Sequence, residues 1–122
     1  MSAILIVGQC GFDDSRIRRV LAPLGAACDS ADSATETLDK VASGGFDLVL
    51  VNRIIDSTGE SGVDLIRQLC ARDGAPPVML VSDYPEAQAE AVSHGALLGF
   101  GKSQLRDPAV LDMLRPLLAH TP

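Results

Sequence analysis

The chain has 122 residues, of which 47 % are hydrophobic and 21 % are charged. This length suffices for one domain with its own apolar core, so we expect a single domain over residues 1–122 without disulfides or a structural metal. The net charge of −6 argues against binding to nucleic acid or to an anionic membrane surface. The expected partners are therefore proteins.

Cysteine usage and hydropathy indicate the compartment. Cys10, Cys28 and Cys70 lie at wide, irregular spacing, without the pairing typical of a metal site. No stretch of about 20 apolar residues could span a bilayer, and no basic segment precedes an apolar run at the N-terminus. We therefore expect a cytoplasmic protein with reduced thiols and no export signal or membrane anchor.

Short apolar runs alternate with amphipathic segments five times, as is typical of a parallel sheet covered by helices on both faces. The first predicted strand is 3–7, and the helix after it is expected to end at Gly25. A weaker strand follows near 26–30. The apolar stripe of the first helix consists of Ile17, Val20, Leu21 and Leu24. The same helix has a basic cluster that is predicted to form a solvated face, namely Arg16, Arg18 and Arg19.

The second helix begins with a capping-box pattern, in which Ser33 is followed three residues later by Glu36. It is expected to end at the glycines 44–45. The third strand is predicted at 47–51 and is followed by a loop over 52–61. The apolar stripe of the third helix consists of Val63, Ile66, Leu69 and Cys70.

Prolines 76–77 break the chain before a fourth strand at 78–81. Pro85 fits the first turn of the next helix, and Asp107 with Pro108 fits the start of the last helix. A short fifth strand is predicted at 97–101. The fourth helix is expected to pack weakly, because its apolar residues are few and small: Ala87, Ala91 and Val92. The stripe of the last helix consists of Val110, Leu111, Leu114, Leu117 and Leu118.

This alternation resembles the receiver domain of two-component response regulators over nearly the whole chain. The resemblance rests on the strand-like segments 4–7, 46–51 and 77–82, and on the spacing from the Gly-Ala step at 95–96 to Lys102. It implies a three-layer, flavodoxin-like (CheY-like), doubly wound parallel sheet of five strands in the order 2-1-3-4-5. The carboxyl ends of the strands then meet at one edge of the sheet.

The resemblance places one site at that edge, made of Gly8, Gln9, Asn52, Ser82 and Lys102. In active receivers, two acids after the first strand help to hold magnesium, and an aspartate ending the third strand accepts the phosphoryl group. Here these positions are Gly8, Gln9 and Asn52. Magnesium prefers carboxylates and water, and a carboxamide is a far poorer nucleophile than a carboxylate. We therefore predict a degenerate receiver that is not an enzyme, binds no metal or cofactor, and acts independently of phosphorylation.

Ser82 and Lys102 match residues that contact the phosphoryl group in the family. In its absence we expect Lys102 to reach the side-chain carbonyl of Asn52, or else to face solvent. The aromatic switch position of the family is Gly99, and Phe100 is displaced by one residue, so its side chain points to the opposite face and is predicted to be in the core. Ser103 replaces the family's proline after the lysine, which puts the family's cis peptide bond in doubt.

Other interpretations remain open. A receiver could be phosphorylated through substitute acids, namely Asp13, Asp14, Asp56 and Asp83, although the first two fit helix caps. Alternatively, the turn 8–11 could bind a nucleotide or another small molecule, but it lacks a third glycine and a Walker lysine. Cys10, His94 and His120 lack catalytic spacing. The loop 56–61 is about two residues longer than the corresponding loop of the family. It is either an altered contact surface or a solvated loop.

The expected function is binding of a protein partner in two-component or phosphorelay signalling. That partner is a signalling kinase, an effector domain or a second copy in a homodimer. The resemblance points to the face formed by the fourth helix, fifth strand and fifth helix. The residues predicted on this face are Glu86, Glu90, His94, Arg106 and Arg115.

Overall fold

The computed structural model describes residues 2–118, and His120 lies outside this range. Five parallel strands form one sheet in the order β2-β1-β3-β4-β5, which confirms the predicted topology. The strands are β1 (Ala3–Val7), β2 (Ala27–Ala31), β3 (Leu48–Asn52), β4 (Val78–Val81) and β5 (Leu97–Phe100). The helices are α1 (Gly11–Leu21), α2 (Ala34–Ala42), α3 (Gly62–Cys70), α4 (Pro85–Ser93) and α5 (Pro108–Leu118). Between residues 2 and 118, no helix is long and apolar enough to cross a bilayer.

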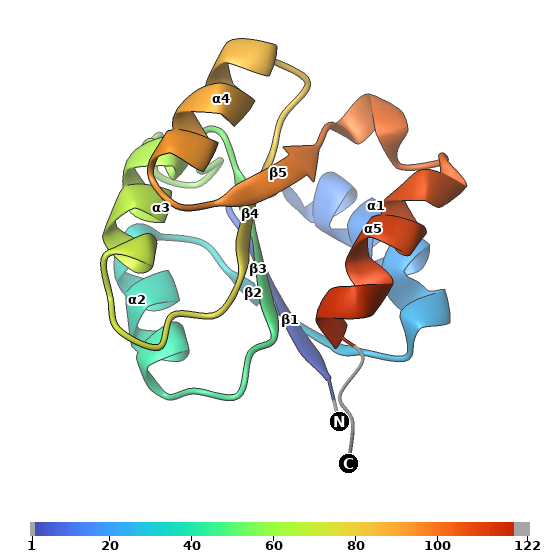
Figure 1. Cartoon of the computed structure of the whole chain (residues 1–122), viewed down its shortest axis with the longest axis horizontal. Helices are drawn as coiled ribbons and strands as arrows, with labels where there is room; N and C mark the ends of the chain where they lie inside the picture. The colour runs from blue at the N-terminus through green and yellow to red at the C-terminus, as the bar shows by residue number, and fades with distance from the viewer. Residues whose placement is uncertain (1, 119–122) are drawn as a thin grey trace.

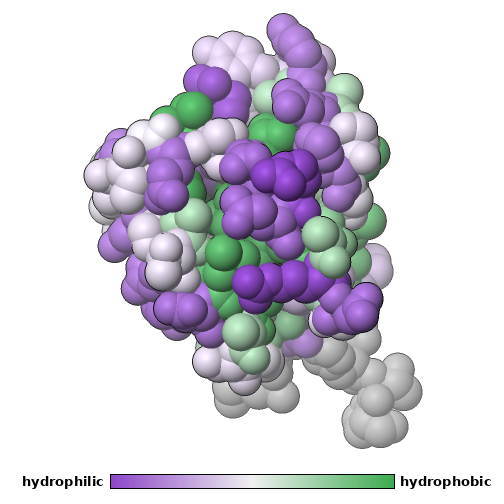
Figure 2. Space-filling model, turned by 90° about the vertical axis from the view of Figure 1, so that its left-hand side faces the viewer, coloured by the Kyte–Doolittle hydropathy of each residue, from purple (hydrophilic) through white to green (hydrophobic). Residues whose placement is uncertain are grey.

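Helices cover both faces of the sheet, with α1 and α5 on one face and α2, α3 and α4 on the other (Figure 1). Successive side chains of β1 and β3 therefore enter two different cores. Phe100 is buried in the core under α1 and α5, as predicted. On the side of the molecule where α2, α3 and α4 lie, apolar side chains are visible between polar ones (Figure 2).

One helix end and one capping motif differ from the prediction for local reasons. Helix α1 stops at Leu21 because Pro23 has no N–H to donate. The chain continues as a 3-10 turn that ends at Gly25, with φ +69°. The capping box is only half formed: the Ser33 hydroxyl accepts from the N–H of Glu36, but the Glu36 carboxylate accepts from the N–H of Asp32 instead.

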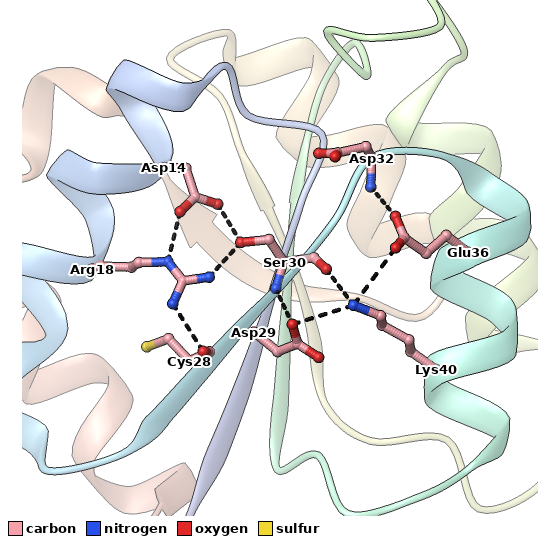
Figure 3. A network of polar contacts seen from close by, with 8 residues as sticks. All are labelled: Asp14, Arg18, Cys28, Asp29, Ser30, Asp32, Glu36 and Lys40. Atoms are coloured by element: carbon pink, nitrogen blue, oxygen red, sulfur yellow. Dashed lines mark hydrogen bonds and ion pairs between the residues drawn. The ribbon is translucent and has the colours of Figure 1, made fainter.

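The free edge of β2 is closed by side chains of α1 and α2 (Figure 3). Arg18 donates to the carbonyl oxygen of Cys28 at 2.9 Å, and Lys40 donates to that of Ser30 at 2.6 Å. Asp29 accepts from the N–H of Ser30 at 2.8 Å. These contacts occupy groups that another strand would otherwise pair with. The prediction that Arg18 is part of a merely solvated helix face is therefore wrong.

A buried glutamine joins α4 to an irregular part of the sheet. Between the pairs Met79↔Leu97 and Val81↔Phe100, β5 has one residue more than β4. The side-chain amide of Gln88 donates to the carbonyl of Leu80 at 2.9 Å and accepts from the N–H of Gly99 at 3.0 Å. Gln88 thus supplies hydrogen bonds that the bulge interrupts.

The buried role of Gln88 was not predicted, because only the apolar residues of α4 were expected to pack against the sheet. Gln88 and Ala91 are the buried residues of the helix, whereas Val92 is 43 % exposed. A Cβ at Gly99 would collide with the backbone of Leu80. The bulge therefore needs glycine at the position where the family has its aromatic switch.

Candidate functional site

The carboxyl edge of the sheet contains a hollow of about 350 Å³ whose wall includes Asn52, Ser82 and Lys102. The structure thus brings these three predicted site residues together. Gly8 adjoins them, because its carbonyl accepts from the side chain of Asn52. Gln9 lines a different hollow.

Gly8 is held in a conformation and a space that suit only glycine. Its φ is +77°, in the left-handed region. A Cβ at this position would lie 2.9 Å from the Cα of Ile55, which is fully buried. The loop after β3 is fastened here, since the N–H of Asp56 donates to the Gly8 carbonyl at 2.9 Å. An acidic side chain at position 8 is therefore sterically excluded by the observed loop.

Asn52 acts as a hydrogen-bond donor to the backbone. Its Nδ2 donates to the carbonyl of Gly8 at 3.1 Å and to that of Ile54 at 2.8 Å. Its Oδ1 accepts from the N–H of Arg53 at 3.1 Å. An ionised aspartate accepts only, so it would face two carbonyl oxygens with no proton to share. The amide at this position is matched to its surroundings.

Lys102 does not contact the Asn52 carbonyl and does not simply face solvent, so both expectations were wrong. Its ammonium donates to Oδ2 of Asp13 at 2.7 Å. The hydrogen bond from Lys102 lowers the pKa of the Asp13 carboxyl below 3.8, against the opposing effect of desolvation. A full carboxylate attracts an ammonium more strongly than a carboxamide does. Asp13 on α1 therefore engages the lysine that the family uses for phosphoryl contact.

Replacing Asp13 with asparagine is expected to lower the free energy of unfolding at neutral pH by about 0.5–1 kcal/mol, as for a partly exposed ion pair. The folded-state pKa lies below the unfolded value of 3.8. The pair therefore stabilises the fold above that value and stops doing so as the pH falls through the folded pKa. Urea unfolding at neutral pH and at a series of acid pH values should show a difference that shrinks as the pH falls below 3.8. The control Asp112→Asn removes an exposed pair with Arg115. A difference for Asp13→Asn that persisted in acid would contradict this assignment.

The loops after β4 and β5 are joined above the same edge. The hydroxyl of Ser82 accepts from the N–H of Tyr84 at 3.1 Å, and the carboxylate of Asp83 accepts from the hydroxyl of Ser103 at 2.5 Å. Every peptide bond in the described part of the chain is trans, including the one before Ser103. Tyr84 also stacks under the guanidinium of Arg53, 4.8 Å from the ring centroid. Sequence patterns gave no signal for this pair.

The candidate substitute acids Asp13 and Asp14 have different partners. Asp13 pairs with Lys102, while Asp14 pairs with Arg18 at 2.6 Å. Within residues 2–118, no group of three His, Cys, Asp or Glu side chains could hold a metal ion. The observed arrangement thus gives no support to a metal site built from these acids.

The loop 56–61 is exposed but hydrogen-bonded. The N–H of Ile55 donates to the carbonyl of Glu60 at 2.9 Å, and the Glu60 carboxylate accepts from the N–H of Ala34 at 3.1 Å. The bond from Ala34 is the main reason why the pKa of Glu60 lies below its usual value. These bonds hold Ile55 against Gly8, a role that the sequence did not reveal.

The five residues predicted on one interaction face do not lie together. Glu86 and Glu90 line a hollow with Val63 of α3, on the side of α4 that faces away from β5. His94 continues this i, i+4 stripe. The groove between α4 and β5 is lined instead by residues that include Ala89, Leu98, Ser103 and Gln104. Arg106 and Arg115 are exposed and line neither of these two hollows.

No protein-family model matches the sequence, and no curated protein matches it significantly. Solved structures do resemble it. NtrX from Brucella abortus superposes with a TM-score of 0.79 at 21 % identity over 96 % of this chain, which spans only 27 % of the NtrX chain. A putative response regulator from Chloroflexus aurantiacus has a TM-score of 0.84 at 17 % identity over 98 % of both chains.

A third structure is the signal receiver domain of an HD domain-containing protein from Pseudomonas fluorescens. It superposes with a TM-score of 0.81 at 24 % identity, covering 96 % of this chain and 86 % of its own. At such identities the similarity concerns the fold. The protein therefore has the CheY-like fold of response-regulator receiver domains.

Proposed function

We propose that the protein is a degenerate receiver-like domain that acts in two-component signalling by binding a protein partner, independently of phosphorylation. The receiver-domain neighbours support the signalling role. The observation that carries the rest is the donor role of Asn52, which ends β3 where the family has its acceptor. In this proposal the domain is cytoplasmic and is neither an enzyme nor dependent on a cofactor or metal.

The chemistry of the edge supports this proposal in three ways. Asn52 offers no anionic oxygen, Gly8 has no side chain, and Lys102 is engaged by Asp13. Asp83 adds a carboxylate to the wall of the hollow, which would repel a phosphoryl group. The end of β3 and the turn after β1 do not offer a divalent cation the paired carboxylates that hold magnesium in protein sites.

Incubation with acetyl phosphate and magnesium, followed by intact-protein mass spectrometry, tests the proposal. We expect no stable phosphoryl adduct, because no carboxylate is available as nucleophile at the end of β3. A receiver domain with an intact acidic site is the positive control. An adduct that maps to this edge of the sheet would contradict phosphorylation independence.

The groove between α4 and β5 is the proposed partner surface. Leu98, which lines this groove, is 64 % exposed, and apolar side chains of this kind are buried at interface centres. Leu98→Asp is expected to weaken binding to a signalling kinase, an effector domain or a second copy, without changing the thermal midpoint. Glu90→Gln, on the other side of α4, is the control. Binding that Leu98→Asp leaves unchanged would exclude this surface.

A further inference from the structure

The hollow between α3 and α4 has apolar side chains in its wall that are left open to solvent. Its volume is about 350 Å³. The apolar residues that line it are Ile54, Val63, Tyr84 and Ala87. Ile54 is 40 % exposed and Tyr84 is 56 % exposed. Exposed apolar side chains that gather beside polar ones are typical of a protein contact site.

The charged residues of the same wall make the hollow acidic. They are Arg53, Glu86 and Glu90. Within residues 2–118, neither glutamate forms an ion pair. Two carboxylates against one guanidinium leave a net negative charge, and that guanidinium already lies over the ring of Tyr84. A partner surface that combines an apolar side chain with a cationic one is therefore complementary to this hollow.

One side of α1 has this complementary chemistry. Phe12, Arg16 and Arg19 are spaced by four and three residues, so they share one side of the helix, here called the Phe12 face. Phe12 is 72 % exposed, more than any other large apolar side chain of the described residues. Arg16 lies over its ring and pairs with Asp13. Arg19 is exposed and forms no ion pair inside the described chain, so its charge is uncompensated.

We propose that the Phe12 face of one copy docks in the hollow between α3 and α4 of a second copy. Phe12 enters the hollow beside Ile54. Arg19 faces Glu86. Helix α1 and the hollow lie on opposite faces of the sheet (Figure 1), so the contact joins two different surfaces and every copy has one of each. The inference rests on the proposed function and deepens it, because it names a second copy as a partner at a surface other than the groove between α4 and β5.

The salt concentration decides whether the contact can be observed. The net charge of −6 makes two copies repel each other at long range. At about 0.1 M salt the Debye length is about 10 Å, so this long-range repulsion is screened. Opposite charges that touch across the contact remain attractive under the same condition, because screening acts less on close, partly buried pairs.

Sedimentation velocity over a range of protein concentrations at this salt tests the contact. We expect the wild type to self-associate. Arg19→Glu would place two carboxylates opposite each other, and Glu86→Arg would place two guanidinium groups opposite each other. Each variant alone should therefore raise the dissociation constant about tenfold or more. An equimolar mixture of the two variants again brings opposite charges together, and should associate about as well as the wild type.

Two further variants separate the apolar part of the contact from a general effect of charge. Phe12→Ser should weaken self-association, because it removes the side chain that enters the hollow. Arg72→Glu is the matched control for Arg19→Glu. Arg72 is exposed in the loop after α3 and forms no ion pair within residues 2–118, so this variant should associate as the wild type does.

A wild type that stays monomeric would overturn the inference and leave the hollow to a different partner. Wild-type association by Arg19→Glu or Glu86→Arg, or a mixture no stronger than the separate variants, would also overturn it. Unchanged circular dichroism and thermal midpoints show that the variants are folded. The acetyl phosphate experiment does not depend on this contact. The comparison of Leu98→Asp with Glu90→Gln is made in dilute protein, below the concentration at which copies associate through this hollow, so failure of one proposal can be distinguished from failure of the other.

Discussion

Aspartate in place of Gly8 is expected to destabilise the folded protein by about 3 kcal/mol or more. A left-handed backbone conformation costs a non-glycine residue roughly 1–2 kcal/mol. The new Cβ would also lie 2.9 Å from Cα and 3.0 Å from Cγ1 of Ile55, so the buried loop after β3 must move. A carboxylate here would in addition be placed beside packed apolar atoms without a partner. Restoring the first acid of an active receiver thus opposes the fold.

Urea and thermal unfolding measure this effect, and a loss of about 3 kcal/mol corresponds to roughly 10 °C in the midpoint. Gly11→Asp is a matched control three residues along the chain. No atom lies within 4 Å of a Cβ at Gly11, and an aspartate in the first turn of α1 is favourable. We expect that control to change stability by less than about 0.5 kcal/mol. Equal midpoints for the two variants would refute the steric account of Gly8.

Gln88→Ala is expected to cost about 2–4 kcal/mol, because it leaves buried backbone groups without partners. The substitution removes donors to the carbonyls of Leu80 and Ser82 and the acceptor for the N–H of Gly99. The site is only 8 % exposed, so water replaces these bonds poorly. The bulge between β4 and β5 should therefore loosen before the rest of the sheet.

Hydrogen exchange of the Gly99 amide reports this loosening directly, and urea unfolding gives the global effect. Gln68→Ala is the control, since the side chain of Gln68 on α3 makes only a long contact of 3.4 Å with Asp64. Fast exchange at Gly99 with little global loss would place the effect in the bulge alone. Protection of Gly99 equal to that of the wild type would contradict the role given to Gln88.

The sheet was predictable because its strands are short apolar runs bounded by glycine, proline and polar residues. The predicted bounds of β1 and β4 agree with the structure, β2 and β3 are each shifted by one residue, and β5 ends one residue earlier than predicted. The end of α1 was missed because the apolar stripe continued past Pro23. A proline inside an apparent helix is the stronger signal, since it cannot donate the backbone bond.

The residues that meet at the site could be predicted, but most of their contacts could not. The order of the parallel strands brings positions 52, 82 and 102 to one edge, and this follows from topology. The partner of Lys102 is Asp13 on α1, which is 89 residues away in sequence. No local sequence pattern indicates a contact between residues so far apart. The fit of Ile55 against Gly8 likewise depends on loop geometry.

The glutamates predicted on the face of α4 and β5 line a different hollow, for a reason that the sequence does contain. Glu86, Glu90 and His94 are spaced by four residues, so they share one side of α4. Gln88 and Ala91 are the residues that turn toward the sheet. Helical periodicity, applied to the polar residues as well as the apolar ones, would have separated the glutamates from the groove beside β5.

The central claim is that the edge of the sheet around Asn52 neither holds magnesium nor accepts a phosphoryl group. The most direct measurement is an NMR titration with magnesium and beryllofluoride, which mimics a phosphoryl group bound to aspartate. The account predicts no saturable shift of the amide signals of Asn52, Ser82 and Lys102. Saturable shifts at these residues, or a crystal structure with either group seated beside Asn52, would contradict it.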